Sequence, residues 1–432
     1  MNGGRVGRNV YGGGNMGSVG KGNYAGGTDD YVNDNAFDAI GYGEKIEGEL
    51  WTKNPAANTN AWYFQNSGKA TVNVISGIVG YIDATNPEKS MKNELPYGNV
   101  IGGSAGEAAP NVADNPTNLY LYSPAFFSGY VNETDVTIGG YRCKTAYGTG
   151  DNAHAVGDMI TAEQYNVLGS SDQSNWELVG PTIYASVYGG GQDGHVRRDT
   201  KVTVLGGEIG VPYESTSDPR TALLKTYGLD DSQWLHRGNI YGGGSGITKY
   251  KFDLDGDGKT DTNDGSLSYN GKPFKEEDYS TSSGSVTRFT EVNVLGGTIH
   301  RNVYGGGSNG SVGAPDMGQG YLPYKKGDTA EGHGPGKQSQ NTVNIGGSTT
   351  TTAIIGTPFD TTKGWTYNKT YGGEVYGACR GMSTLDANQF ANSIWTQVNI
   401  FDKATIMGNV YGGGDNGITK KDSEVIIGGV KQ

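Results

Sequence analysis

The sequence predicts an all-β protein, a parallel β-helix (β-solenoid) of about seven coils with long loop insertions. Glycine supplies 75 of the 432 residues, against a usual share of about 7%. The chain also carries 28 tyrosines and recurrent valine-rich runs, so it has side chains to bury. Because the glycines keep fixed offsets from valine and tyrosine, the pattern indicates ordered structure rather than a flexible linker.

Two short motifs alternate along the whole chain. Unit A reads VYGGG or a close variant and begins at Val10, Val100, Val187, Ile240, Val303, Val375 and Val410. Unit B reads V-x-V/I followed by glycines and begins at Val72, Val136, Val202, Val292, Val343, Val398 and Val425. The shortest A-to-B and B-to-A steps together give a coil of about 26 residues, typical of a solenoid repeat. The segments GHV, GIT and GSV, which follow several A copies, are expected to form a third short strand.

The residue pattern within the units predicts which side chains face inward. In unit B, alternation places Val202 and Val204 on one face of the strand and threonine and lysine on the other. Successive coils then stack their valines and isoleucines into a buried column. The glycines fit tight corners, so a β-branched residue at Gly305 or Gly412 should destabilise the stack.

In unit A the residue after the valine is expected to point away from this column. It is tyrosine in six of the seven copies: Tyr11, Tyr188, Tyr241, Tyr304, Tyr376 and Tyr411. Two interpretations fit these positions, a stacked aromatic ladder that stabilises the sheet and a platform that binds sugar rings. The spacing of the tyrosines does not separate the two.

The chain is treated as one domain, 1–432, interrupted by insertions at about 20–68, 77–98, 141–185, 211–236, 249–288, 314–340 and 349–372. Insertions project from a solenoid and commonly carry its function. Exposed aromatic residues suited to stacking on sugars, or to covering the rod edge, are Trp51, Trp62, Tyr63, Trp365 and Tyr367. Neither terminus shows a cap, so a fragment of a longer repeat protein or a subunit that stacks end to end is expected.

One insertion contains the sharpest motif of the sequence, DLDGDGKTDTND at residues 253–264. A calcium loop of this type needs oxygen ligands at positions 1, 3, 5, 7, 9 and 12 and glycine at position 6. The corresponding ligands are Asp253, Asp255, Asp257, the carbonyl of Lys259, Asp261 and Asp264, with Gly258 at the turn. We therefore expect structural calcium; the alternative is a solvated acidic loop. The twelve residues resemble the calcium loops of dockerins, where the last ligand is usually Asp.

Signals for catalysis and for charged partners are weak. His195, Arg197 and Asp199 alternate along one strand and are expected to face outward, and Arg198 lies beside them. One of the arginines would serve as the base of a polysaccharide lyase, whereas solvated charge pairs explain the same residues. The net charge of −12 disfavours nucleic acid and anionic lipid as partners. No run of apolar residues is long enough for a membrane span.

The recurring pattern N-V-Y-G-G-G-x-x-G, followed by T-x-V-x-V/I-x-G-G, resembles repeat regions of large surface or secreted proteins of Bacteroides-type bacteria. Residues 9–17, 302–310 and 409–417 carry the first part, and the B units carry the second. The resemblance implies a non-enzymatic adhesin or scaffold, extracellular or at the cell surface, that binds a glycan or a protein. A β-helix polysaccharide lyase or glycoside hydrolase and a self-stacking filament subunit are the alternatives.

Overall fold

The computed structural model describes the chain in separate stretches. These are residues 1–15, 69–80, 98–106, 129–131, 133–196, 199–212, 237–246, 283–286, 288–313, 339–357, 372–382 and 391–429, with Val19 and a few short strands between them.

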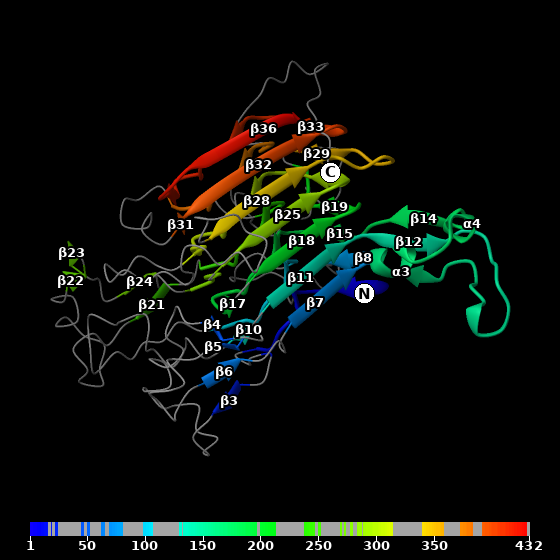
Figure 1. Ribbon diagram of the computed structural model, residues 1–432, viewed down its shortest axis with the longest axis horizontal. Coiled ribbons are helices and arrows are strands. Elements are labelled where there is room, and N and C mark those ends of the chain that lie inside the picture. The colour runs from blue at the N-terminus through cyan, green and yellow to red at the C-terminus, as the bar shows by residue number, and fades with distance from the viewer. Residues whose placement is uncertain are drawn as a thin grey trace, which may run out of the picture.

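Three parallel sheets of seven strands each build a rod (Figure 1). Sheet A contains the A units, as β2 (Val10–Tyr11), β9 (Val100–Ile101), β16 (Val187–Tyr188), β20 (Ile240–Tyr241), β27 (Val303–Tyr304), β30 (Val375–Tyr376) and β34 (Val410–Tyr411). Sheet B contains the B units, as β7 (Lys69–Val74), β11 (Glu133–Ile138), β18 (Thr200–Val204), β25 (Thr290–Val294), β28 (Gln340–Ile345), β32 (Trp395–Phe401) and β36 (Ser423–Gly429). The predicted fold, a parallel β-helix of seven coils, is therefore confirmed.

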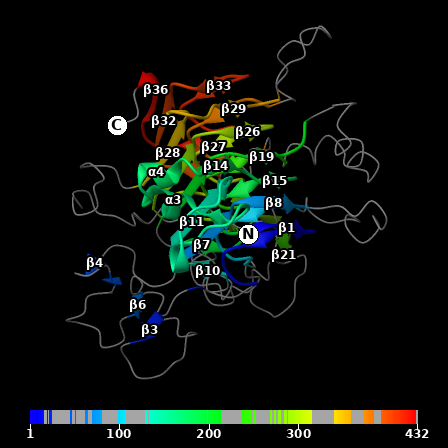
Figure 2. The ribbon, with the colours of Figure 1, turned by 90° about the vertical axis from the view of Figure 1, so that its right-hand side faces the viewer.

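The third sheet, sheet C, differs from the expectation in its position along the chain. It is built from β1 (Asn2–Val6), β8 (Ser76–Val79), β15 (Thr182–Ile183), β19 (Glu208–Ile209), β26 (Gly297–Ile299), β29 (Ala353–Ile355) and β33 (Ala404–Ile406), so each coil runs C, A, B. Figure 2 shows sheets B and C rising as separate columns. Glycines such as Gly207, with φ of 99°, and Gly297, with φ of 87°, turn the chain straight after a B strand. The next two or three residues already extend as a strand.

The segments expected as the third strand form a shorter, additional column instead. GHV contributes β17 (His195–Val196), which pairs in parallel with β10 (Tyr130–Val131), and GIT contributes β35 (Ile418–Thr419), which pairs with β31 (Asn392–Ser393). GSV contributes Val312, which forms a single bridge with Val286. Val196, Val286 and Val312 are buried in a small cluster of their own.

Three of the ranges expected to be insertions overlap strands of sheet C: 77–98 and 349–372 begin too early, and 141–185 ends too late. Residues 77–79, 182–183 and 353–355 belong to β8, β15 and β29, which are strands of sheet C. Short antiparallel pairs lie within other insertions: β3 (Gly22–Tyr24) with β6 (Trp62–Phe64), β4 (Lys45–Ile46) with β5 (Leu50–Trp51), β21 (Lys249–Lys251) with β24 (Glu277–Tyr279), and β22 (Ser268–Tyr269) with β23 (Lys272–Pro273).

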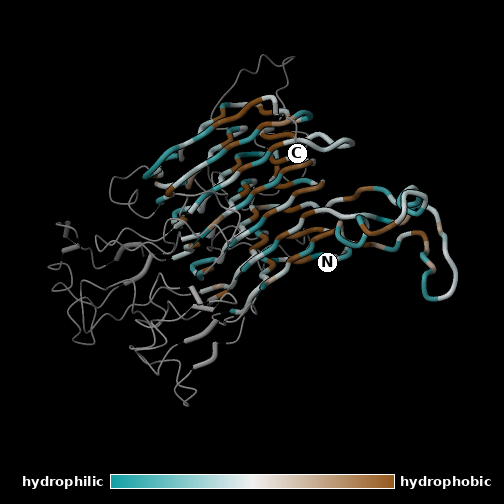
Figure 3. The backbone as a smooth tube through the Cα atoms, in the orientation of Figure 1, coloured by the Kyte–Doolittle hydropathy of each residue, from teal (hydrophilic) through white to brown (hydrophobic). Residues whose placement is uncertain are grey.

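A dry column of branched side chains fills the rod. Val202 lies opposite Val292 and Val292 opposite Val343, and all three are fully buried. The same register holds between every neighbouring pair of B strands, so each valine stacks on its equivalent one coil away. Figure 3 shows the resulting hydrophobic stripes crossing the strands. Burial of this column is the main stabilising term of the rod.

Buried threonines connect sheet B to sheet A across the core. Thr290 donates its hydroxyl hydrogen to the carbonyl of Gly305, the first glycine of the next A unit, at 2.6 Å. Thr134, Thr200 and Thr396 make the same bond to the first glycine of their own next A unit. An inward carbonyl left without a partner costs about 1–3 kcal/mol, so the threonine at this position keeps the corner compatible with a dry interior.

The first glycine of each A unit lies against the carbonyl of the equivalent glycine in the next coil. A Cβ atom built on Gly305 would come 2.2 Å from the carbonyl oxygen of Gly377, a distance that no side chain tolerates. Gly412, in the last coil, has more room, because its nearest contact would be the Cβ of Ser423 at 2.9 Å. The sequence predicted that a larger residue at either glycine would destabilise the stack. The geometry supports this prediction more strongly for Gly305 than for Gly412.

We expect Gly305→Ala to destabilise the rod by at least about 3 kcal/mol, because backbone rather than a flexible side chain opposes the new methyl group. Gly413→Ala is the matched control: its Cβ would meet only the hydroxyl of Thr419, at 3.8 Å. Thermal unfolding followed by circular dichroism measures both variants. Equal melting temperatures for the two variants would contradict the corner geometry.

Candidate functional site

The tyrosines of sheet A form a continuous stack on its outer side. Ring centroids of successive residues are 4.7–5.0 Å apart, with nearly parallel planes, from Tyr188 through Tyr241, Tyr304 and Tyr376 to Tyr411. The first four are at most 3% exposed, whereas Tyr411, in the last coil, is 41% exposed. Of the two interpretations, the stacked ladder therefore describes the four inner rings, which offer no free face to a sugar.

Polar groups satisfy the hydroxyls of this tyrosine ladder. Asn302 donates its amide to the Tyr304 hydroxyl at 3.0 Å, and Arg380 donates to the Tyr241 hydroxyl at 3.4 Å. The Tyr376 hydroxyl donates to Glu374. Burial raises the pKa of Tyr188, Tyr304 and Tyr376, and in Tyr376 the hydrogen bond to Glu374 raises it further.

A second column consists of polar side chains, which the sequence analysis did not single out. Its members are the residues two positions before each ladder residue in the sequence. The side-chain oxygens of Asn99, Asn239 and Asn302 each accept the backbone N–H of the equivalent residue one coil further on, at 3.0–3.2 Å. Ser186 does the same for Asn239 at 3.1 Å. The Asn that begins the pattern N-V-Y-G-G-G could have predicted this column, because a buried amide at a corner accepts hydrogen bonds from backbone N–H groups.

The weak catalytic candidates do not converge into a site within the described residues. His195 is 3% exposed, not outward-facing as expected, and its Nδ1 lies 3.1 Å from the Ser285 hydroxyl. It lies in β17 of the additional column, which pairs with β10 on one side and bridges to Val286 on the other. Asp199 accepts the Phe289 backbone N–H at 3.3 Å and lies 3.5 Å from Nε of Arg288. Arg197 and Arg198 lie outside the described residues.

The calcium loop and most of the predicted sugar-stacking residues also lie outside the described part of the chain. This holds for Asp253, Asp255, Asp257, Lys259, Asp261, Asp264, Trp365 and Tyr367. Trp51 falls in β5, while Trp62 and Tyr63 fall in β6, and only the backbone pairing of these strands is described. Within the described stretches, no group of three or more His, Cys, Asp or Glu is placed to hold a metal ion.

The described insertion with the most structure is an arm, defined here as residues 140–179. It leaves the rod at the end of β11 and returns at β15 (Figure 1). β12 (Gly140–Cys143) pairs antiparallel with β13 (Met159–Ile160) and β14 (Trp176–Val179), and the short helices α3 (Ala162–Asn166) and α4 (Ser170–Gln173) connect the two outer strands. A capping box between Thr161 and Gln164 begins α3. The arm thus has a small fold of its own.

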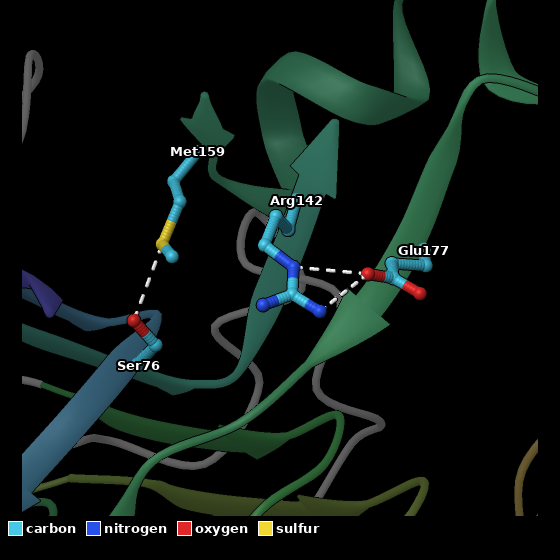
Figure 4. Close-up of polar contacts among 4 residues, drawn as sticks. All are labelled: Ser76, Arg142, Met159 and Glu177. Atoms are coloured by element: carbon cyan, nitrogen blue, oxygen red, sulfur yellow. Dashed lines mark hydrogen bonds and ion pairs between the residues drawn. The ribbon is translucent and has the colours of Figure 1, made fainter. Parts of the chain in front are cut away.

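Contacts at its base hold the arm to the rod (Figure 4). The Ser76 hydroxyl of β8 donates to the Met159 sulfur at 3.2 Å. Across the arm's own sheet, Arg142 makes two hydrogen bonds to one carboxylate oxygen of Glu177, at 2.6 and 2.9 Å. Gly140 lies so close to Ile75 and to the Ile160 carbonyl that a Cβ there would clash at 2.8 Å.

An aromatic cluster forms the interior of the arm. The Trp176 indole N–H donates to the Tyr147 hydroxyl at 2.9 Å, and the rings of Tyr147 and His154 lie 5.1 Å apart. Trp176 is buried, whereas Tyr147 and His154 remain half-buried at the surface. Val156, close to them in the sequence, is 67% exposed. The arm tip, defined here as Tyr147, His154 and Val156, combines aromatic, apolar and hydrogen-bonding groups.

The sequence analysis placed an insertion here but named none of these residues as candidates. The spacing of Tyr141, Tyr147, His154, Tyr165 and Trp176 follows no repeat, so periodicity gave no signal. Local aromatic density was the signal that could have found them. Tyr141 and Tyr165 stack with centroids 3.5 Å apart, which fastens α3 to β12.

Comparisons with protein-family models, with curated proteins and with solved structures found no match to this chain. No helix in the described stretches is long and apolar enough to cross a membrane.

The tyrosine ladder predicts alkaline unfolding. The folded pKa values of Tyr188, Tyr304 and Tyr376 lie above the unfolded value of about 10, so the stability that these three hydroxyls contribute is complete below about pH 10 and is lost as the pH rises above it. Burial lowers the pKa of Arg237 to about 10, which acts in the opposite direction, but three ladder hydroxyls outnumber this one guanidinium.

We expect the unfolding free energy to fall steeply above about pH 10, together with a cooperative rise in tyrosinate absorbance. Denaturant titrations at a series of pH values, followed by circular dichroism and ultraviolet absorbance, measure both. Gradual, non-cooperative ionisation of all the tyrosines near pH 10 without loss of structure would contradict a buried ladder.

Proposed function

We propose that this chain is an extracellular, non-enzymatic scaffold of the adhesin type, which displays appended elements for binding a glycan or a protein. The observation that carries the proposal is the arm, a separately folded element held away from a rod whose repeating side chains bind one another. Solenoids commonly use such insertions for recognition, while the rod sets their position.

The polar side chains of the rod form hydrogen bonds with neighbouring coils, which supports a structural role for the rod. The outward asparagines of sheet B bond along the column, Asn399 to Asn344 at 2.8 Å and Asn344 to Asn293 at 2.9 Å. The corner asparagines and the inward threonines bond to backbone. His195 and Asp199, the described members of the catalytic alternative, are likewise bound to neighbouring coils.

The arm tip supplies the kind of surface that recognises sugars. Aromatic rings present apolar faces to the C–H groups of a sugar, and Tyr147 and His154 add hydrogen-bonding groups at the ring edges. The net charge of −12 favours neutral glycans over sulfated or phosphorylated ones. The chemistry proposed for the tip is therefore stacking on a neutral glycan.

A glycan array probed with the intact chain tests the function. We expect binding to neutral glycans, weakened at least about tenfold by His154→Ala combined with Val156→Asp, because these changes remove apolar and hydrogen-bonding contacts at the tip. Lys201→Ala, on the exposed outer side of sheet B, is the control and should leave binding unchanged. Turnover of any polysaccharide would overturn the proposal in favour of an enzyme.

Calcium is proposed to stiffen the insertion that carries residues 253–264. We expect calorimetric titration to show calcium binding by the wild-type chain and its loss in Asp253→Ala combined with Asp255→Ala, because two of the oxygen ligands disappear. Protease resistance of the insertion should rise with calcium in the wild type alone. Equal calcium binding by both chains would exclude this loop as the site.

A further inference from the structure

The outer face of sheet B loses its charge at two neighbouring strands, β28 and β32. Of the seven strands described for sheet B, five carry at least one charged residue, whereas β28 and β32 carry none. We call the outward side chains of these two strands the uncharged strip. They are amides, one hydroxyl and two aromatic rings: Gln340, Thr342, Asn344, Trp395, Gln397, Asn399 and Phe401. Figure 1 shows sheet B on the near side of the rod.

The two aromatic rings lie at opposite ends of β32. Trp395 begins the strand and Phe401 ends it, and both side chains are half-buried. Because they are six residues apart, they face the same side of the sheet, and the rise of a β-strand separates them by roughly 20 Å. Within the described part of the chain, the Trp395 indole N–H has no hydrogen-bond partner. The ring can therefore stack on a sugar while its N–H donates to a hydroxyl.

The amides between the two rings are held in place by their neighbours in the adjacent coil. Asn399 donates to the Asn344 side-chain oxygen at 2.8 Å, and Gln340 donates to the Gln397 side-chain oxygen at 3.0 Å. Ile426 lies beside Asn399 on the next strand and has no side-chain donor. Among the described residues, the Asn399 carboxamide oxygen consequently accepts no hydrogen bond. An amide whose conformation is already fixed loses little entropy when it binds a ligand.

The size and surroundings of the uncharged strip indicate what it can bind. Two strands that are seven residues long cover roughly 200 Å², whereas a stable protein interface buries about 800 Å² on each partner. The strip is therefore too narrow for a folded protein and wide enough for one extended polymer chain. Glu291 on one side and Glu424 on the other are exposed, so an anionic polymer would meet repulsion on both sides.

We propose that the uncharged strip binds a single extended chain of an uncharged polysaccharide, whose sugar rings stack on Trp395 and Phe401. The amides and the Thr342 hydroxyl between the two rings bind its hydroxyl groups. This surface belongs to the rod itself and is independent of the proposed recognition by the arm tip. Because the two rings are far apart, binding strengthens with chain length until the ligand covers both.

Affinity electrophoresis of the intact chain tests the binding. The gels contain mixed-linkage β-glucan, xylan, galactomannan or dextran, with polygalacturonate as the charged comparison. We expect at least one neutral polymer to retard the wild type, and polygalacturonate to leave it unretarded. Trp395→Ala should raise the dissociation constant for that polymer at least about tenfold, whereas Trp395→Phe keeps a ring and most of the affinity. Thr71→Ala, exposed on the same face in β7, is the matched control and should behave like the wild type.

Chain length separates this site from the arm tip. Calorimetric titrations use oligosaccharides of increasing length made from the polymer that retards the wild type. In the arm variant, His154→Ala combined with Val156→Asp, we expect the affinity still to rise with length and to level off once the ligand covers roughly 20 Å. Trp395→Ala should remove this dependence on length.

Three results would each overturn the proposal. They are no retardation by any of the four neutral polymers, an unchanged dissociation constant in Trp395→Ala, and an affinity that does not depend on the length of the oligosaccharide. Circular dichroism of Trp395→Ala and Trp395→Phe establishes that both variants are folded. Loss of binding in the arm variant alone would place recognition at the arm tip and would likewise exclude the uncharged strip.

Discussion

The structure depends on the stacking of one coil's branched side chains on the equivalent side chains of the next. This stacking requires the backbones of adjacent coils to stay at the spacing of paired strands along their whole length, corners included. Gly305 shows the consequence, since its α-carbon faces the Gly377 carbonyl at a distance that excludes even a methyl group. Glycine at the corner and valine in the strand therefore serve the same requirement, that adjacent coils stay at the spacing of paired strands.

The repeat made most of the rod predictable from the sequence. The alternation of valines identified sheets A and B and their inward faces, because a two-residue period assigns each side chain to one side. Sheet C was misplaced because its strands, such as Glu208–Ile209, are too short to show a period and, unlike the equally short strands of sheet A, carry no recurring motif such as VYGGG. Only their position after a glycine turn distinguishes them.

The candidate site was less predictable, for the same physical reason. The arm is stabilised by contacts between Tyr147, His154 and Trp176, which are irregularly spaced and belong to no repeat. Periodicity cannot report such contacts, and the local density of aromatic residues indicates a cluster without saying which rings meet. The prediction for His195 was also wrong: alternation predicted an exposed face, but His195 is buried among the strands of its own column, where it contacts Ser285.

The one-dimensional order of the rod has a mechanical consequence. Each coil contacts the coil before it and the coil after it, so the interfaces between coils are arranged in series along the axis. A pulling force applied between the two ends is transmitted in full through every interface, and the rod yields at the least cohesive one. Ala70 in the first B strand and Asn341 in the fifth occupy the position where four other B strands place a threonine bonded across the core, so the interfaces beside them lack that threonine hydrogen bond. Tension would part the rod at one of these two interfaces before it disturbed those that the threonines reinforce.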